Sequence, residues 1–435
     1  MSLRECIGQM LMPHHPLQKL QTDFPAVMKA STEDWLRLLD DIPLGGICVR
    51  MPPSPETKIM LEKIQAESSV PIIIAANIEP GTTTRAIGGR GDGQEPEVLD
   101  YAGMAPPMMG FGAANDPNLT YETCRLIAEQ RLAYGFHWTF TPVIDLDLNF
   151  KNPVTNVRSL GDDTEKVLQQ SIEFIRGFQH GGLMAATAKH FPGDGTDERD
   201  QHLLTTSNHL SVDDWWMSYG KIWRSVIDAG VNAVMVGHIA FPAYERRRGD
   251  TELALPGTLS NKLQTELLRE ELGFQGVIIS DASPMIGITS RVRPAENIRA
   301  GADICLLPET ISDFGLIEGA VRDGMLTEDG IRDSVRRILE MKSRLHLHKD
   351  VFLSGEKEYS SEQSEQIVNA VAEKSITRAP KMLPAPTSKV RREFFSSICL
   401  WTLCSQIRIW TSWRALCGRK GAPSNNCSTR PTLSS

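Results

Sequence analysis

Residues 185–238 decide the fold class, because AATAKHF (Ala185–Phe191) and NAVMVGH (Asn232–His238) are short apolar runs with a helical pattern between them. In that pattern, Ser211 and Asp214 form a capping box ahead of apolar residues spaced three or four positions apart, which predicts a helix over Ser211–Gly230. A strand, a helix and a second strand in this order are typical of parallel strands joined by a crossover helix. The stretch therefore predicts an α/β protein.

The same alternation continues on both sides of this stretch. Further apolar runs that we expect to be strands are Gly45–Arg50, Pro71–Asn77, Trp138–Leu146, Gly276–Ser280 and Ala302–Leu307. Helical patterns run from Ser260 to a C-capping Gly273 and over Glu328–Leu345. No glycine-rich dinucleotide motif follows the first strand, so a (β/α)8-type TIM-like barrel over residues 1–350 is favoured over a doubly wound sheet.

Polar residues follow the predicted strands at or just beyond their carboxyl ends. A barrel assembles its active site at these ends, whereas a single such residue could equally be a hydrogen-bonded loop residue. The coincidence of all of them indicates a site: Asn77, Glu79, Asp145, Lys189, His190, His238 and Asp281.

The most specific signal is KHFPGDG (Lys189–Gly195), followed after four residues by Asp200-Gln201-His202. Downstream, GVIISDASPM (Gly276–Met285) contains S-D-x-x-x-M, and upstream lie TPVID (Thr141–Asp145) and RSLG (Arg158–Gly161). In combination and spacing, these motifs resemble glycoside hydrolase family 3, in particular its β-N-acetylhexosaminidase branch. The resemblance spans roughly residues 5–380.

This resemblance implies a retaining exo-β-N-acetylglucosaminidase that acts on amino-sugars from cell wall or chitin. It makes Asp281 the nucleophile that forms a glycosyl-enzyme ester, and His202 the acid/base, held by Asp200 as a catalytic dyad. Gly193 and Gly195 could let the dyad loop swing over the sugar. Structurally, the same residues could also be a solvated turn and a strand-end cap.

The remaining candidates would bind the sugar. Arg158, Lys189 and His190 are predicted donors to sugar hydroxyls, and Asp145 is predicted to orient Arg158 or Lys189. Alternatively these charges form an ion-pair network below the barrel mouth, and His238 is a core histidine. Asn77, Glu79 and Met285 complete the predicted binding set.

The chain departs from the family pattern at three positions. Asn77 stands where the family usually has an aspartate that grips distal hydroxyls, so binding there is expected to be weaker or altered. Asp194 replaces a histidine often found between the two glycines, and Ala282 follows the nucleophile in place of a second acid. None of the three removes a catalytic group.

Composition excludes several other classes. The chain has 435 residues and a net charge of −8, which divides into −16 for residues 1–380 and +8 for residues 381–435. An acidic body gives no reason to expect a nucleic-acid partner, and no apolar run is long enough to span a membrane. Cys6, Cys48, Cys124 and Cys305 have no metal-ligand spacing and are predicted buried thiols. We expect a cytoplasmic protein with a small carbohydrate substrate, no metal and no cofactor.

The end of the chain has a different composition. Residues 351–380 resemble a linker and the helix and entry strand of a second α/β domain, with Gln363–Thr377 as that helix and strand. Residues 381–435 are basic and rich in Cys and Trp, without a sustained helix or strand period, and are predicted to be an irregular, non-homologous tail. Activity is expected to be independent of this tail.

Three other functions remain open from the sequence. A β-glucosidase of the same family is disfavoured by the Asp200-x-His202 pair, because family glucosidases usually take the acid/base carboxylate from the second domain. A phosphorylase is possible because a neutral histidine repels phosphate less than a carboxylate does. The last alternative is a non-catalytic sugar-binding chain.

Overall fold

The computed structural model describes residues 1–14, 32–49, 54–81, 101–247, 249, 253–288, 293–347 and 359–377. The chain divides into two compact units, Met1–Thr377 and Arg378–Ser435, and all described residues belong to the first. The predicted boundaries at 350 and 380 stay predictions, and the tail 381–435 lies outside the described residues.

Short, buried, parallel strands make up three sheets of this unit. Their orders are β1–β10, β2–β3–β4 and β5–β7–β9, and a separate parallel pair is formed by β6 (Thr206–Ser207) and β8 (Ile239–Ala240). The strands of the three sheets are β1 (Leu11–Met12), β2 (Gly46–Cys48), β3 (Ile73–Ala76), β4 (Trp138–Thr139), β5 (Thr187–Phe191), β7 (Ala233–Val236), β9 (Val277–Ser280) and β10 (Cys305–Leu306). Each of the predicted apolar runs contains one of these strands, and only β1 among these sheets was not predicted.

Isolated parallel bridges connect neighbouring sheets. His14, beyond β1, pairs with Cys48 at the end of β2, and Ile279 in β9 pairs with Ile304 next to β10. Two further bridges, Trp138 with Ala185 and Val143 with Lys189, connect the β4 segment to the β5 segment. The strands of the three sheets therefore share one direction and a chain of neighbour contacts.

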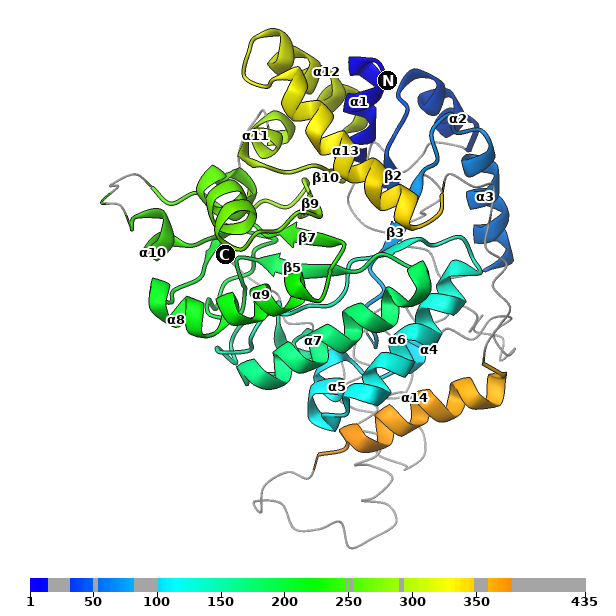
Figure 1. The fold of residues 1–435 in the computed structure, drawn as a ribbon, viewed down its shortest axis with the longest axis vertical. Helices are drawn as coiled ribbons and strands as arrows, with labels where there is room; N and C mark the ends of the chain where they lie inside the picture. Colours follow the sequence, from blue (N-terminus) through cyan, green and yellow to red (C-terminus); the bar gives the residue numbers. More distant parts are fainter. Residues whose placement is uncertain are drawn as a thin grey trace, which may run out of the picture. The chain divides into compact units, whose positions relative to one another are not determined.

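Helices surround the strands (Figure 1). The helix α7 shows why they form: Asp163 caps it by accepting from the backbone N–H of Lys166, and Val167, Phe174 and Phe178 on one face are buried. The helices are α1 (Leu3–Gln9), α2 (Thr32–Asp41), α3 (Pro55–Ala66), α4 (Tyr101–Met104), α5 (Met108–Ala114), α6 (Pro117–Leu132), α7 (Thr164–Phe178), α8 (Val212–Met217), α9 (Tyr219–Asp228), α10 (Pro242–Glu245), α11 (Arg293–Ala300), α12 (Thr310–Arg322), α13 (Glu328–Arg344) and α14 (Ser361–Ser375). Shorter or irregular turns are η2 (Asn156–Arg158), η3 (His180–Gly182), η4 (Gly257–Leu259) and the π-helix η5 (Lys262–Glu271).

The single helix predicted over Ser211–Gly230 is wrong in one respect, because the structure breaks it at Ser218 into α8 and α9. The Ser218 hydroxyl donates to the carbonyl of Asp214, a bond that competes with the helical ladder. The break lets Trp215 and Trp223 both donate to the carbonyl of Pro192, at 2.9 and 3.3 Å. The two helices thereby hold the loop that begins after β5.

The helix predicted after residue 360 is present as α14, which packs against α5 and α6 and buries Val368 and Val371. Lys374 near its end pairs with Asp116. No strand follows α14 up to Thr377, where the described residues end, so the expected entry strand stays a prediction.

The predicted buried thiols are confirmed, because Cys6, Cys48, Cys124 and Cys305 are all free and buried. Burial raises the pKa of Cys124 and raises that of Cys305 to about 12. Across the described ranges, no helix is both long and apolar enough to cross a membrane.

Candidate active site

The polar residues at the strand ends converge on one edge of the parallel strands. Asn77 and Glu79 follow β3, Lys189 and His190 lie in β5, and Asp281 follows β9 directly. Asp145 lies beyond β4 and His238 beyond β7, so the strands bring all the predicted strand-end residues to the carboxyl side. The electrostatic influence of Asp281 reaches Arg158, Lys189 and His238, which places the group in one neighbourhood.

Glu79 binds two cations at the centre of one cluster. It accepts two bonds from Arg158, both 2.8 Å long, and its Oε1 lies 2.6 Å from Lys189 Nζ. Burial raises the pKa of Glu79, but Arg158 and Lys189 outweigh it and lower that pKa well below its usual range. Lys189 also donates to Asn77 Oδ1 at 3.2 Å. The carboxylate that orients both cations is therefore Glu79.

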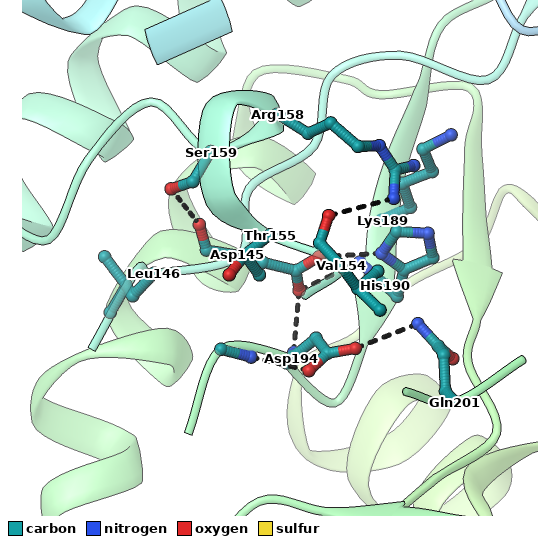
Figure 2. A network of polar contacts seen from close by, with 12 residues as sticks. Asp145, Leu146, Val154, Thr155, Arg158, Ser159, Lys189, His190, Asp194 and Gln201 are labelled. Atoms are coloured by element: carbon teal, nitrogen blue, oxygen red, sulfur yellow. Dashed lines mark hydrogen bonds and ion pairs between the residues drawn. The ribbon is translucent and has the colours of Figure 1, made fainter. Parts of the chain in front are cut away.

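Asp145 has different partners from those predicted. Its Oδ2 accepts from His190 Nδ1 at 2.7 Å, and its Oδ1 accepts from the backbone N–H groups of His190 and Asp194 at 3.2 and 2.8 Å (Figure 2). The prediction that Asp145 orients Arg158 or Lys189 is wrong, because Glu79 occupies that place. Asp145 instead fixes the ring of His190 with its Nε2 directed away from Asp145.

Asp281 is buried at the end of β9, and its Oδ1 accepts from the backbone N–H of Ala282 at 2.7 Å. Burial raises the pKa of Asp281, yet His190, His238, the Ala282 N–H and Lys189 together lower it below its usual value. A desolvated carboxylate that stays ionised is suited to act as a nucleophile.

His238 and Met285 border the acid. The Nδ1 of His238 lies 2.8 Å from Thr258 Oγ1, and its Nε2 lies 3.1 Å from the carbonyl of Ala282. Burial lowers the pKa of His238. Met285 is buried on the turn after Asp281, and its N–H donates to the carbonyl of Ala282.

The Asp200/His202 pair differs from these groups in exposure. His202 Nδ1 lies 2.6 Å from Asp200 Oδ1, and the side chains are 55% and 32% exposed, respectively. The carbonyl of His202 accepts from the backbone N–H of Ile286 at 2.9 Å, so the pair is attached to the turn that follows Asp281.

The glycines before the pair are required by packing. A Cβ on Gly195 would lie 1.8 Å from the carbonyl oxygen of Leu146, and a Cβ on Gly193 would lie 2.4 Å from the ring of Tyr219. Both residues also have positive φ, +133° and +99° for Gly193 and Gly195. Both positions therefore require glycine in this conformation of the loop.

Sequence reasoning missed Asn152, Asp194 and Gln201 as site components. Asp194 is buried and accepts from the side chains of Asn152 and Gln201 at 2.8 and 3.0 Å. The available signal was that Asp194 occupies the variable position of G-x-G and Gln201 the variable position of D-x-H.

No group of three or more potential metal ligands occurs among the residues that the structure describes. A cavity of about 630 Å³ lies elsewhere, beside Glu245, Leu255 and Arg299, and none of the predicted site residues lines it. The candidate site is thus defined by the convergence of charged side chains and not by that cavity.

The fold and these motifs define a class. The model of the glycosyl hydrolase family 3 N terminal domain matches residues 2–341, so the chain belongs to this family. A curated relative from Cellulomonas fimi, named beta-N-acetylglucosaminidase/beta-glucosidase, is 36% identical over 76% of this chain. The match covers 58% of that protein, so this chain spans little more than half of its length.

Two solved structures extend the comparison. A family 3 β-N-acetylglucosaminidase from Paenibacillus sp. str. FPU-7 aligns with a TM-score of 0.76 and 29% identity, covering 90% of this chain and 72% of its own. The beta-glucoside phosphorylase BglX aligns with a TM-score of 0.76 and 28% identity over 89% of this chain and 67% of its own. Similarity therefore extends to enzymes that are named for different activities.

Proposed function

We propose that this chain is a retaining exo-β-N-acetylglucosaminidase that uses Asp281 as nucleophile and His202 with Asp200 as the acid/base pair. The observation that carries the proposal is the position of a buried, ionised Asp281 on a turn that is hydrogen-bonded to the His202 backbone. The named activities of the relatives from Cellulomonas fimi and Paenibacillus support the sugar class.

In the first step, an Asp281 oxygen attacks the anomeric carbon and the bond to the aglycone oxygen breaks. Since His202 Nδ1 is bound to Asp200, its Nε2 is the nitrogen that gives a proton to the departing oxygen. The product is a glycosyl ester of Asp281. In the second step, Nε2 takes a proton from water, the water oxygen attacks the anomeric carbon, and Asp281 is released with net retention.

The buried cluster supplies the sugar-binding groups. Arg158, Lys189 and His190 present donors that Glu79 and Asp145 hold in place, so little reorganisation is needed when hydroxyls arrive. Asn77 lies at the exposed side of this cluster, and His238 and Met285 border Asp281.

Phosphorolysis is the second candidate, and the similarity to BglX is the observation that favours it. In that reaction, phosphate replaces water in the second step and the product is a glycosyl phosphate. An exposed histidine carries no negative charge that would repel the phosphate dianion.

The test is turnover of 4-nitrophenyl N-acetyl-β-D-glucosaminide and of the matching glucoside, each with and without inorganic phosphate. We expect preference for the N-acetyl sugar and free N-acetylglucosamine as product. Preference for the glucoside would make the chain a β-glucosidase, and a sugar phosphate as main product would make it a phosphorylase. No turnover of either substrate would leave a sugar-binding chain.

We also propose that the parallel strands close into a (β/α)8-type barrel. Two observations support a continuous ring of eight strands. The strand β1 pairs with β10, and isolated bridges connect β1 to β2, β4 to β5 and β9 to β10. Such a ring accounts for the position of every site residue at one end. The cytoplasmic location is a separate prediction, and cell fractionation tests it.

A further inference from the structure

We propose that Asp194 and Gln201 form a hydrogen-bonded clamp that positions the acid/base loop, and that the two are positioning residues for His202. The inference rests on the proposed function, because it assigns a role relative to the acid/base. Gln201 lies between Asp200 and His202, so whatever holds its side chain holds the backbone of both.

Both polar atoms of the Gln201 side-chain amide are hydrogen-bonded, and these two bonds hold the loop. Gln201 is fully buried, although its neighbours Asp200 and His202 are partly exposed. Its Nε2 donates to Asp194 Oδ2 at 3.0 Å, and its Oε1 accepts from the backbone N–H of His238 at 3.1 Å. The amide of Gln201 therefore connects Asp194, in the loop after β5, to His238, beyond the end of β7.

Asp194 is itself fixed by the sugar-binding side of the site. Its Oδ1 accepts from Asn152 Nδ2 at 2.8 Å and from the Gly195 N–H at 2.7 Å. Its own N–H donates to Asp145, and Figure 2 shows this contact together with the contact to Gln201. Asp145 also holds His190. One chain of bonds thus runs from His190 through Asp145 and Asp194 to Gln201, and it relates the acid/base loop to the sugar subsite.

The donor and the acceptor of each hydrogen bond in the clamp are fixed. An ionised Asp194 only accepts, so Gln201 must present its NH₂ to Asp194 and its oxygen to His238. Burial, with Asp145 adding to it, raises the pKa of Asp194 to about 6, which still leaves it ionised at pH 7. The bond from Gln201 is then charge-assisted and stronger than one between neutral partners.

This direction leaves each single substitution without a full set of hydrogen bonds unless the variant takes up a proton. In Asp194→Asn, the oxygen is needed by Asn152 and Gly195, so the new NH₂ faces the NH₂ of Gln201. Reversing Gln201 only moves the donor conflict to the N–H of His238. In Gln201→Glu, two carboxylates face each other at the same place, and they can form a hydrogen bond only after one of them takes up a proton.

The double variant Asp194→Asn/Gln201→Glu reverses the polarity and restores every bond. The new asparagine donates to one oxygen of the new glutamate, and the other oxygen accepts from His238. The side chains, their total charge and their approximate volume are the same as in the natural pair. A clamp therefore predicts reciprocal rescue, which a purely steric role for either residue does not require.

The experiment compares both single variants and the double variant on two β-N-acetylglucosaminides, one with a 2,4-dinitrophenyl and one with a 4-methoxyphenyl aglycone. We expect each single variant to lose about 10- to 100-fold in kcat/KM on the methoxyphenyl substrate, a part of the 10²–10⁴ that acid/base catalysis supplies. The loss should be much smaller for dinitrophenyl, and the double variant should recover to within about threefold of wild type.

Gln170→Glu is the matched control, since Gln170 is also buried and hydrogen-bonded, to Thr120 on α6, away from the site. Its kcat/KM should show no dependence on the leaving group.

His202→Ala is measured in parallel: if it lacks the leaving-group dependence, the proposed function fails. If His202→Ala shows that dependence but the double variant is as impaired as the single variants, only the clamp is contradicted. Should the single variants fail to fold, an active, folded double variant supports the clamp and an unfolded one contradicts it.

Discussion

The two halves of the candidate site differ in how their charges are held. Glu79, Arg158 and Lys189 form a dense cluster in which Glu79 and Lys189 are almost fully buried. His202 and Asp200 form a single pair with substantial exposure. The difference matches two chemical tasks, because a sugar-binding subsite gains from groups fixed before binding, whereas an acid/base must reach first an aglycone and then water.

Substitution of Asp281 should lower activity the most, because Asp281 itself bonds to the anomeric carbon of the sugar. We expect Asp281→Asn to lower kcat/KM by about 10⁴-fold or more for every aglycone, while the fold is retained. Azide added to Asp281→Ala should yield a glycosyl azide of inverted configuration. Activity of more than a few per cent in either variant would mean that another carboxylate is the nucleophile.

Glu79→Gln tests the buried half. Removing this charge leaves Arg158 and Lys189 without the carboxylate that is bonded to both of them, so the free energy of unfolding should fall by about 3–5 kcal/mol. The loss of kcat/KM should be the same for good and poor leaving groups. Glu165→Gln, which breaks an exposed pair with Lys221, should change stability by about 1 kcal/mol or less. Equal effects of the two variants would contradict the distinction between buried and exposed charge.

The raised pKa of Asp194 gives the clamp a measurable pH dependence. Its folded-state pKa of about 6 lies above the ordinary value of 3.8, so between these pH values the folded protein binds a proton that the unfolded chain has released. Stability relative to Asp194→Asn should therefore rise as pH falls from 7 to 4, by about 3 kcal/mol at most. Chemical denaturation at several pH values measures this, and a difference that falls with acidification would contradict the shift.

Asn77→Asp should have the smallest effect. Lys189 now donates to the side-chain oxygen of Asn77 at 3.2 Å, and the substitution would replace this amide by a carboxylate. The effect is small because position 77 is exposed and Lys189 is already paired with Glu79. We expect kcat/KM to change by less than about tenfold, through KM and with equal size for both aglycones. A change in the leaving-group dependence would place Asn77 on the aglycone side.

The sequence predicted most of the strands for a physical reason. Strands buried on both faces, such as β5 and β7, need continuous apolar runs, and these are visible without any structure. The strand β1 lies in a run of only three apolar residues, Met10–Met12, between Gln9 and Pro13, and so leaves no such pattern, whereas β4 and β10 have the same length but lie in longer apolar runs.

The limits of sequence reasoning appear in the pairing of the site residues. Strand ends predicted which residues gather, but not that Glu79 would bind the two cations and Asp145 would bind His190. That choice depends on side-chain direction and on the path of the loop after β5. The bond between Asp194 and Gln201 was missed for the same reason, since its two ends meet only when the loop folds back.

The most direct test of the difference between the two halves is the pre-steady-state release of 2,4-dinitrophenolate by His202→Ala. This leaving group needs no proton, so we predict a rapid burst of about one equivalent, followed by slow turnover because water is no longer activated. On an unactivated aglycone the same variant should lose about 10²–10⁴-fold in the first step. Equal losses of the first step for both aglycones, or full activity of His202→Ala, would contradict the assignment of His202 as the acid/base.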